Sequence, residues 1–144
     1  MAQILQKSRV FQRFPKELKS PILYSLNHDS DILLLKFYEN GNRMFAYDSS
    51  PGYFTGKITP PAFKKEEFNN LVQRFGLQAK TKELESVLTD KKYVFADERH
   101  RAFLKLFSFP EFVAGIGYTY LSMDESILPE IQKLGFEVKK VKAR

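Results

Sequence analysis

The chain has 144 residues, a formal net charge of +6, 14 Phe and 7 Tyr, and this length suits one domain with a substantial hydrophobic core. The absence of cysteine excludes disulfide bonds, thiolate zinc sites and a thiol nucleophile. No run approaches the roughly 18 apolar residues of a membrane span, and the N-terminus lacks the apolar core of a signal peptide. We therefore expect a soluble, cytoplasmic, single-domain protein over residues 1–144, without membrane association and with short mobile ends at 1–6 and 143–144.

The positive charge lies at the two ends of the chain. Residues 1–20 carry five Lys and Arg against one Glu, and residues 137–144 carry four against one. Residues 21–136 carry 14 Lys and Arg against 15 Asp and Glu. This distribution predicts an anionic partner that the ends bind.

The first half of the chain is predicted to be an antiparallel β-meander. Asn40-Gly41 suits the positive φ angles of a tight hairpin turn. Alternation along the strand before this turn predicts that Leu33, Leu35 and Phe37 share one face. The expected strands are 9–14, 21–26, 31–38, 43–47 and a short one at 53–58.

The second half alternates helices with strands. Pro60-Pro61 is expected to open a helix that Gly76 ends, and Asp97 is the candidate cap of another helix that runs to residue 107. The pattern as a whole predicts an α+β fold, with a mixed, mainly antiparallel sheet and three to four helices packed on it. The remaining expected elements are a weak helix at 82–88, strands at 93–96, 112–121 and 136–142, and a helix at 127–134 ended by Gly135.

Neither histidine predicts a catalytic or metal site with any specificity. His28 lies in a segment rich in turn-forming residues, and His100 shares a helix side with Phe103 and Phe107, which places it at the edge of the core. A metal site or an acid–base pair with the neighbouring carboxylates is the alternative for each. Gly115 belongs to a Gly-x-Gly on an expected strand, which is not a phosphate-binding loop. We expect no cofactor and no metal.

The basic ends are the candidate binding site, with a merely solubilising surface as the alternative. The N-terminal segment interleaves cations with aromatic rings, the combination that single-stranded nucleic-acid binding uses. At the C-terminus, alternation in a strand would align lysines along one face. The candidate residues are Lys7, Arg9, Phe11, Arg13, Phe14, Lys139, Lys140 and Lys142.

Residues 20–58 resemble the KTSC domain, a small β-meander. The resemblance lies in Tyr24, the strand from Leu33 to Phe37, Asn40-Gly41, and the run from Ser50 to Phe54. It implies a β-meander and, as suspected for that family, nucleic-acid binding. This similarity covers about a quarter of the chain.

Residues 120–138 look like the closing strand, helix and Leu-Gly-Phe strand of the GNAT acetyltransferases. That family binds the coenzyme A pyrophosphate with a glycine-containing turn before a helix, and no such turn precedes residues 98–107. We therefore place a degenerate acetyltransferase third among the functions considered. The first is a non-catalytic nucleic-acid-binding protein that favours single strands, and the second is an accessory or inhibitor that docks on an acidic surface of a larger complex.

Overall fold

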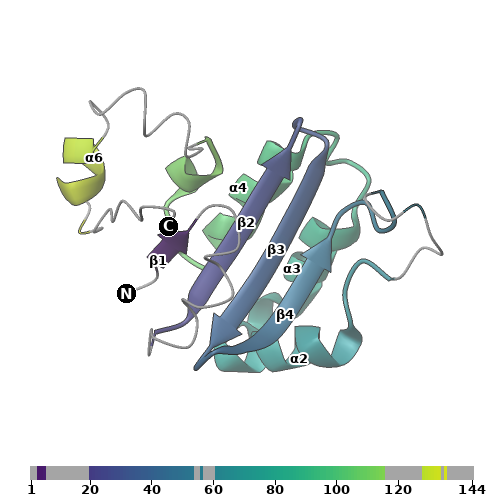
Figure 1. Cartoon of the computed structure of the whole chain (residues 1–144). Helices are drawn as coiled ribbons and strands as arrows, with labels where there is room; N and C mark the ends of the chain where they lie inside the picture. The colour runs from purple at the N-terminus through teal and green to yellow at the C-terminus, as the bar shows by residue number, and fades with distance from the viewer. Residues whose placement is uncertain are drawn as a thin grey trace.

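The computed structural model describes residues 3–5, 20–53, 56, 61–115, 128–133 and 135. It has the expected α+β fold, in which one mixed sheet carries α2, α3 and α4 on one face (Figure 1). The sheet order follows the chain, with β1 parallel to β2 and the other neighbours antiparallel. The strands are β1 (Gln3–Leu5), β2 (Ile22–His28), β3 (Ile32–Glu39) and β4 (Asn42–Asp48), and the α-helices are α2 (Lys65–Arg74), α3 (Thr81–Thr89), α4 (Ala96–Leu106) and α6 (Leu128–Lys133).

The predicted hairpin is confirmed as β3 and β4. Asn40 and Gly41 form its turn with φ angles of 50° and 80°, the left-handed pair that this kind of turn requires. Phe37 pairs with Phe45, and a register shift follows at Phe37/Tyr38. The turn chemistry and the alternating pattern together determine which side chains face the helices.

One core fills the space between the sheet and the three helices. Leu33, Leu35 and Phe37 lie in it, as predicted from alternation, and all three are fully buried. The Phe37 ring centroid lies 5.1 Å from that of Phe75 in the turn after α2 and 5.4 Å from that of Phe107 after α4. Aromatic contacts therefore join the sheet to both helices.

Helix α2 begins later than expected, at Lys65 rather than at the prolines. Phe63 packs on Phe68 with ring centroids 5.2 Å apart, which is the hydrophobic staple of a helix start. At the other end Gly76 adopts φ 66°, and the Leu77 N–H donates to the Val72 carbonyl at 2.9 Å. This Schellman motif confirms that Gly76 ends the helix.

Two expectations near α4 are wrong. Residues 93–95 form a loop rather than a strand, and Asp97 lies inside the first turn of a helix that begins at Ala96 with Phe95 as its N-cap. The Ala96 N–H donates to the Ser30 carbonyl at 2.7 Å. A contact with the β2–β3 turn thus starts this helix in place of a side-chain cap.

The prediction of a strand at 112–121 is wrong for its described residues. Residues 111–115 form the 3₁₀ helix η3 (Glu111–Gly115). At its start, the Val113 N–H donates a hydrogen bond to the Pro110 carbonyl at 3.3 Å. The weak helix at 82–88 is confirmed as α3, preceded by the 3₁₀ helix η2 (Gln78–Lys80), and the helix at 127–134 is confirmed as α6 over Leu128–Lys133.

Several expectations lie wholly or partly outside the described residues. They include the strands at 9–14 and 136–142 and residues 116–121. Of the strand expected at 53–58, only Tyr53 and Gly56 are described, and neither is in a strand. Among the described residues, no helix has both the length and the apolar character needed to cross a membrane.

Candidate nucleic-acid interface

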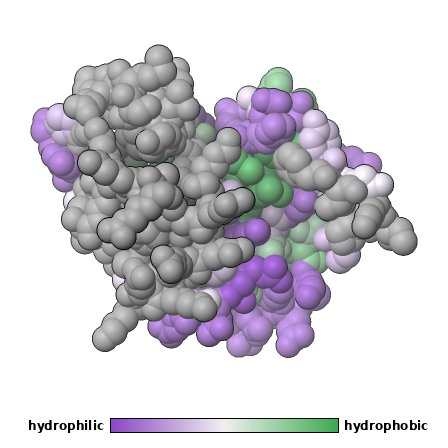
Figure 2. Space-filling view, in the orientation of Figure 1, coloured by the Kyte–Doolittle hydropathy of each residue, from purple (hydrophilic) through white to green (hydrophobic). Residues whose placement is uncertain are grey.

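The face of the sheet opposite the helices also carries apolar and aromatic side chains. Successive side chains of a strand point to opposite faces of the sheet. Because Leu23, Leu35 and Phe37 point into the core, the residues next to them in each strand point to this outer face. Its side chains are partly exposed except for Ile22 and Ile32, which are buried, and Figure 2 shows hydrophobic surface on this side of the molecule. The outer-face residues of the central strands include Ile22, Tyr24, Leu26, Ile32, Leu34, Lys36, Tyr38 and Ala46.

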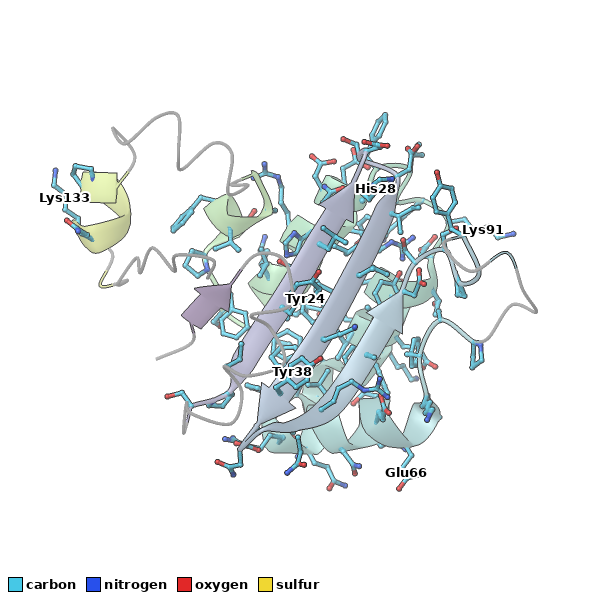
Figure 3. All side chains as sticks on the ribbon, viewed as in Figure 1. Tyr24, His28, Tyr38, Glu66, Lys91 and Lys133 are labelled. Carbon is cyan, nitrogen blue, oxygen red and sulfur yellow. The ribbon has the colours of Figure 1, made fainter. Side chains whose placement is uncertain are left out.

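Two tyrosines and a lysine lie together at the centre of this outer face. Tyr24 pairs with Lys36 across the strands, and the Lys36 Nζ lies 5.9 Å from the Tyr24 ring centroid. Tyr38 lies two residues along β3 on the same face (Figure 3). Burial, followed by the nearby Tyr38 hydroxyl, raises the pKa of Tyr24, so this phenol is a neutral hydrogen-bond donor at physiological pH.

An aromatic pair beside a cation on a sheet is a suitable surface for unpaired nucleotides. Bases stack on aromatic rings, and a lysine neutralises phosphate charge. Both stacking and charge neutralisation tolerate many base sequences, because every base has a flat face and every nucleotide carries a phosphate. The outer face therefore combines the two elements of sequence-tolerant single-strand binding.

The pairing of β1 with β2 places Leu5, the residue before the basic N-terminal segment, beside Tyr24. Leu5 pairs with Tyr24, and Gln3 pairs with Ile22. Residues 6–19, which carry five Lys and Arg against one Glu, thus begin beside Tyr24 and end next to Ser20, just before β2. The segment is an internal connection between two neighbouring strands.

All eight candidate residues from the sequence lie outside the described residues, so the structure does not place them individually. They are Lys7, Arg9, Phe11, Arg13, Phe14, Lys139, Lys140 and Lys142. The described residues contain 13 Lys and Arg against 13 Asp and Glu, and the remainder of the chain contains 10 against 4. The whole net charge of +6 therefore belongs to the segments outside the described fold.

Tyr24, Lys36 and Tyr38 are site residues that were not predicted from the sequence. The available signal was the period of two within the hairpin: side chains that alternate with Leu35 and Phe37 must face the other side of the sheet. Both faces of β3 are rich in large side chains, so a search for polar clusters could not single out the outer one.

The histidines do not form a second candidate site. His100 is buried in α4, as expected for a core residue, and His28 ends β2 with its Nε2 3.3 Å from the Asp29 carboxylate. Within the described ranges, no three side chains of His, Cys, Asp or Glu come together as a metal site would require.

The chain matches no family model, no curated protein and no solved structure in the comparisons. The resemblances to the KTSC domain and to the GNAT acetyltransferases therefore stay predictions.

Proposed function

We propose that this protein binds single-stranded nucleic acid on the outer face of its sheet, with the basic segments holding the phosphate backbone. The observation that carries the proposal is the pairing of Leu5 with Tyr24. It attaches the start of the basic N-terminal segment directly to the strand that bears the first aromatic residue of the face.

The division of charge supports this arrangement. The described fold is neutral, so electrostatic attraction to a polyanion comes from the terminal segments. Lys7 follows Leu5 by two residues, and a chain reaches at most about 3.6 Å per residue, which keeps the Lys7 backbone within about 7 Å of β1. A single strand of nucleic acid bound on the outer face would therefore lie within reach of the basic segment.

The experiment is fluorescence anisotropy with labelled single-stranded and duplex oligonucleotides at fixed salt. We expect the single strand to bind more tightly than the duplex, because a duplex keeps its bases stacked away from the protein rings. Replacing Tyr24 and Tyr38 one at a time by Leu keeps an apolar side chain but removes the ring. Each change should weaken binding by about fivefold to a hundredfold, since one stacked base is worth roughly 1–3 kcal/mol.

Lysines on opposite sides of the fold provide the matched control. Lys36→Glu should weaken binding, whereas Lys80→Glu in η2, an exposed position on the helix side, should leave it close to that of the wild type. Absence of binding to any oligonucleotide would refute the proposed function. Binding that is unaffected by the Tyr24 and Tyr38 changes would place the site elsewhere.

The second candidate function, docking on an acidic surface of a larger complex, relies on the same basic segments. It gains support if an acidic polypeptide competes for the protein while oligonucleotides do not. Of the two candidate functions, the aromatic pair on the outer face favours nucleic-acid binding, because a purely electrostatic contact with an acidic protein surface needs no stacking surface.

A further inference from the structure

Three large hydrophobic side chains are exposed in the described part of the chain, and all three lie at one end of the sheet. They are Tyr53, Val94 and Phe95, with 61%, 70% and 51% of their surface exposed. Exposed apolar residues that gather in one place and are surrounded by polar groups are typical of a protein contact surface. Scattered surface residues of this kind would need no such explanation.

One hydrogen bond and one ring contact hold Phe95 and Tyr53 beside the β2–β3 turn. The Ala96 N–H donates to the Ser30 carbonyl at 2.7 Å, which fixes the adjoining Phe95 next to the turn. The Tyr53 ring lies 6.1 Å from the His28 ring at the end of β2. We call this surface, formed by residues 28–31, 49–53 and 91–95, the turn end.

The turn itself has an unusual backbone. Asp29 and Ser30 both have positive φ angles, 50° and 61°, a conformation that costs a non-glycine residue about 1 kcal/mol or more. Retention of such strained residues is more frequent at functional surfaces than elsewhere. The hydrogen bond from the Ala96 N–H to the Ser30 carbonyl places this turn next to Phe95.

Charges of opposite sign flank the apolar residues. Asp29 and Asp31 are exposed on the turn, while exposed Lys91 and Lys92 precede Val94 in the chain. His28 marks the turn and Lys91 marks the basic loop at the same end of the sheet in Figure 3. Phe95 therefore lies next to the acidic turn, and the two lysines precede the Val94–Phe95 pair in the chain. Lys92 also approaches the Asp90 carboxylate, at 3.8 Å.

A surface with this order of charges is complementary to itself. Two copies related by a two-fold axis would bring the acidic turn of each copy against the basic loop of the other, with the apolar residues in the centre. We propose that the turn end is a self-association surface and that the occupant is a second copy of this chain. The contact is independent of the proposed nucleic-acid site, which lies on the outer face of the sheet.

Sedimentation velocity over a series of protein concentrations tests the proposal. The wild type should show a reversible monomer–dimer equilibrium. Phe95→Ser should weaken the dimer at least tenfold, because the exposed ring is removed. Its fold should persist, since Phe95 is the N-cap of α4 and serine is a good N-cap residue.

Charge reversal gives the sharper test. One variant combines Asp29→Asn with Asp31→Lys, since asparagine tolerates the positive φ angle, and the other combines Lys91→Glu with Lys92→Glu. Each variant alone should dimerise at least tenfold more weakly than the wild type. A mixture of the two should form a heterodimer, because both contacts across the two-fold axis then pair opposite charges.

Three outcomes would overturn the proposal. The first is a wild type that stays monomeric at every concentration. The second is a dimer that neither the Phe95 change nor the charge changes affect. The third is a mixture of the two charge variants that associates no better than either variant alone.

Discussion

His100 lies in an environment very different from that of a free side chain in water. It is only 3% exposed, and neither ring nitrogen has a hydrogen-bond partner among the described residues. Burial, with help from the neighbouring Arg101 charge, lowers the pKa of His100 from 6.5 to about 4. A buried imidazole without partners destabilises the fold once it must carry a proton.

We predict that the protein loses stability as the pH falls from about 6.5 to about 4. In this interval the unfolded chain binds a proton at His100 and the folded chain does not, so protonation favours unfolding. The shift in pKa from 6.5 to about 4 corresponds to about 3 kcal/mol, at about 1.4 kcal/mol per pKa unit. Urea unfolding measured at several pH values would show the decline.

His100→Leu is the variant that isolates this contribution. It should be less sensitive to pH over the same interval, because leucine fills the site without titrating. His28→Gln is the matched control, since His28 is the other histidine of the chain and its side chain is 39% exposed, and it should keep the decline of the wild type. An equal decline in the His100→Leu variant would show that other groups cause the acid sensitivity.

At the scale of elements, α2 and α4 end in the same way but with different residues. Gly76 and Ser108 both follow a helix with positive φ angles, 66° and 55°. The Phe109 N–H donates to the Leu104 carbonyl at 2.8 Å, just as the Leu77 N–H does to the Val72 carbonyl. Serine at this position is strained where glycine is not.

Substitutions at these two helix ends should therefore have opposite effects on the stability of the protein. Ser108→Gly should stabilise the protein by roughly 0.5–1 kcal/mol, because relief of the left-handed strain exceeds the added freedom of the unfolded chain. Gly76→Ala should destabilise it by about 1 kcal/mol. A Cβ at Gly76 would contact nothing within 4 Å, so backbone strain alone is tested. Thermal melts of both variants decide the matter, and shifts of the same sign would contradict the explanation.

The elements show which features of the fold were predictable. The hairpin and α2 follow from local chemistry: Asn40-Gly41 fixes a turn, and Gly76 ends a helix. The start of α4 depends on the Ser30 carbonyl, a contact between residues 66 positions apart that no local pattern encodes. The Tyr-Val-Phe run at 93–95 has strand propensity, but it lies in a loop where Val94 and Phe95 are exposed.

Prediction of the candidate site had a similar limit. The charge excess of the ends is visible in the sequence, because it requires only counting. The aromatic pair of the outer face cannot be recognised in the sequence. Tyr24 and Tyr38 come together only through the register of β2 and β3, which pairs Tyr38 with Ile22. The parallel pairing of β1 with β2 is a long-range contact of the same kind.

At the scale of the whole molecule, the net charge and the Tyr24–Tyr38 pair belong to different parts of the chain. The net charge of +6 lies in segments outside the described fold, and the aromatic pair belongs to the sheet. If the proposed function holds, the two parts contribute to affinity in different ways. Charge neutralisation releases counterions and depends on salt, whereas stacking on rings does not depend on salt to first order.

Salt titrations of oligonucleotide binding should therefore distinguish two classes of variant. Reversing Lys7, Arg9 and Arg13 to Glu should reduce the slope of the logarithm of the binding constant against the logarithm of salt concentration, by about 0.7 for each phosphate that the variant no longer neutralises. Tyr24→Leu with Tyr38→Leu should lower affinity at every salt concentration by a similar factor and keep the slope of the wild type. Equal slopes for the wild type and the charge variant would remove the basic N-terminal segment from the site. A reduced slope for the tyrosine variant would instead show that the outer face contributes by positioning phosphates rather than by stacking.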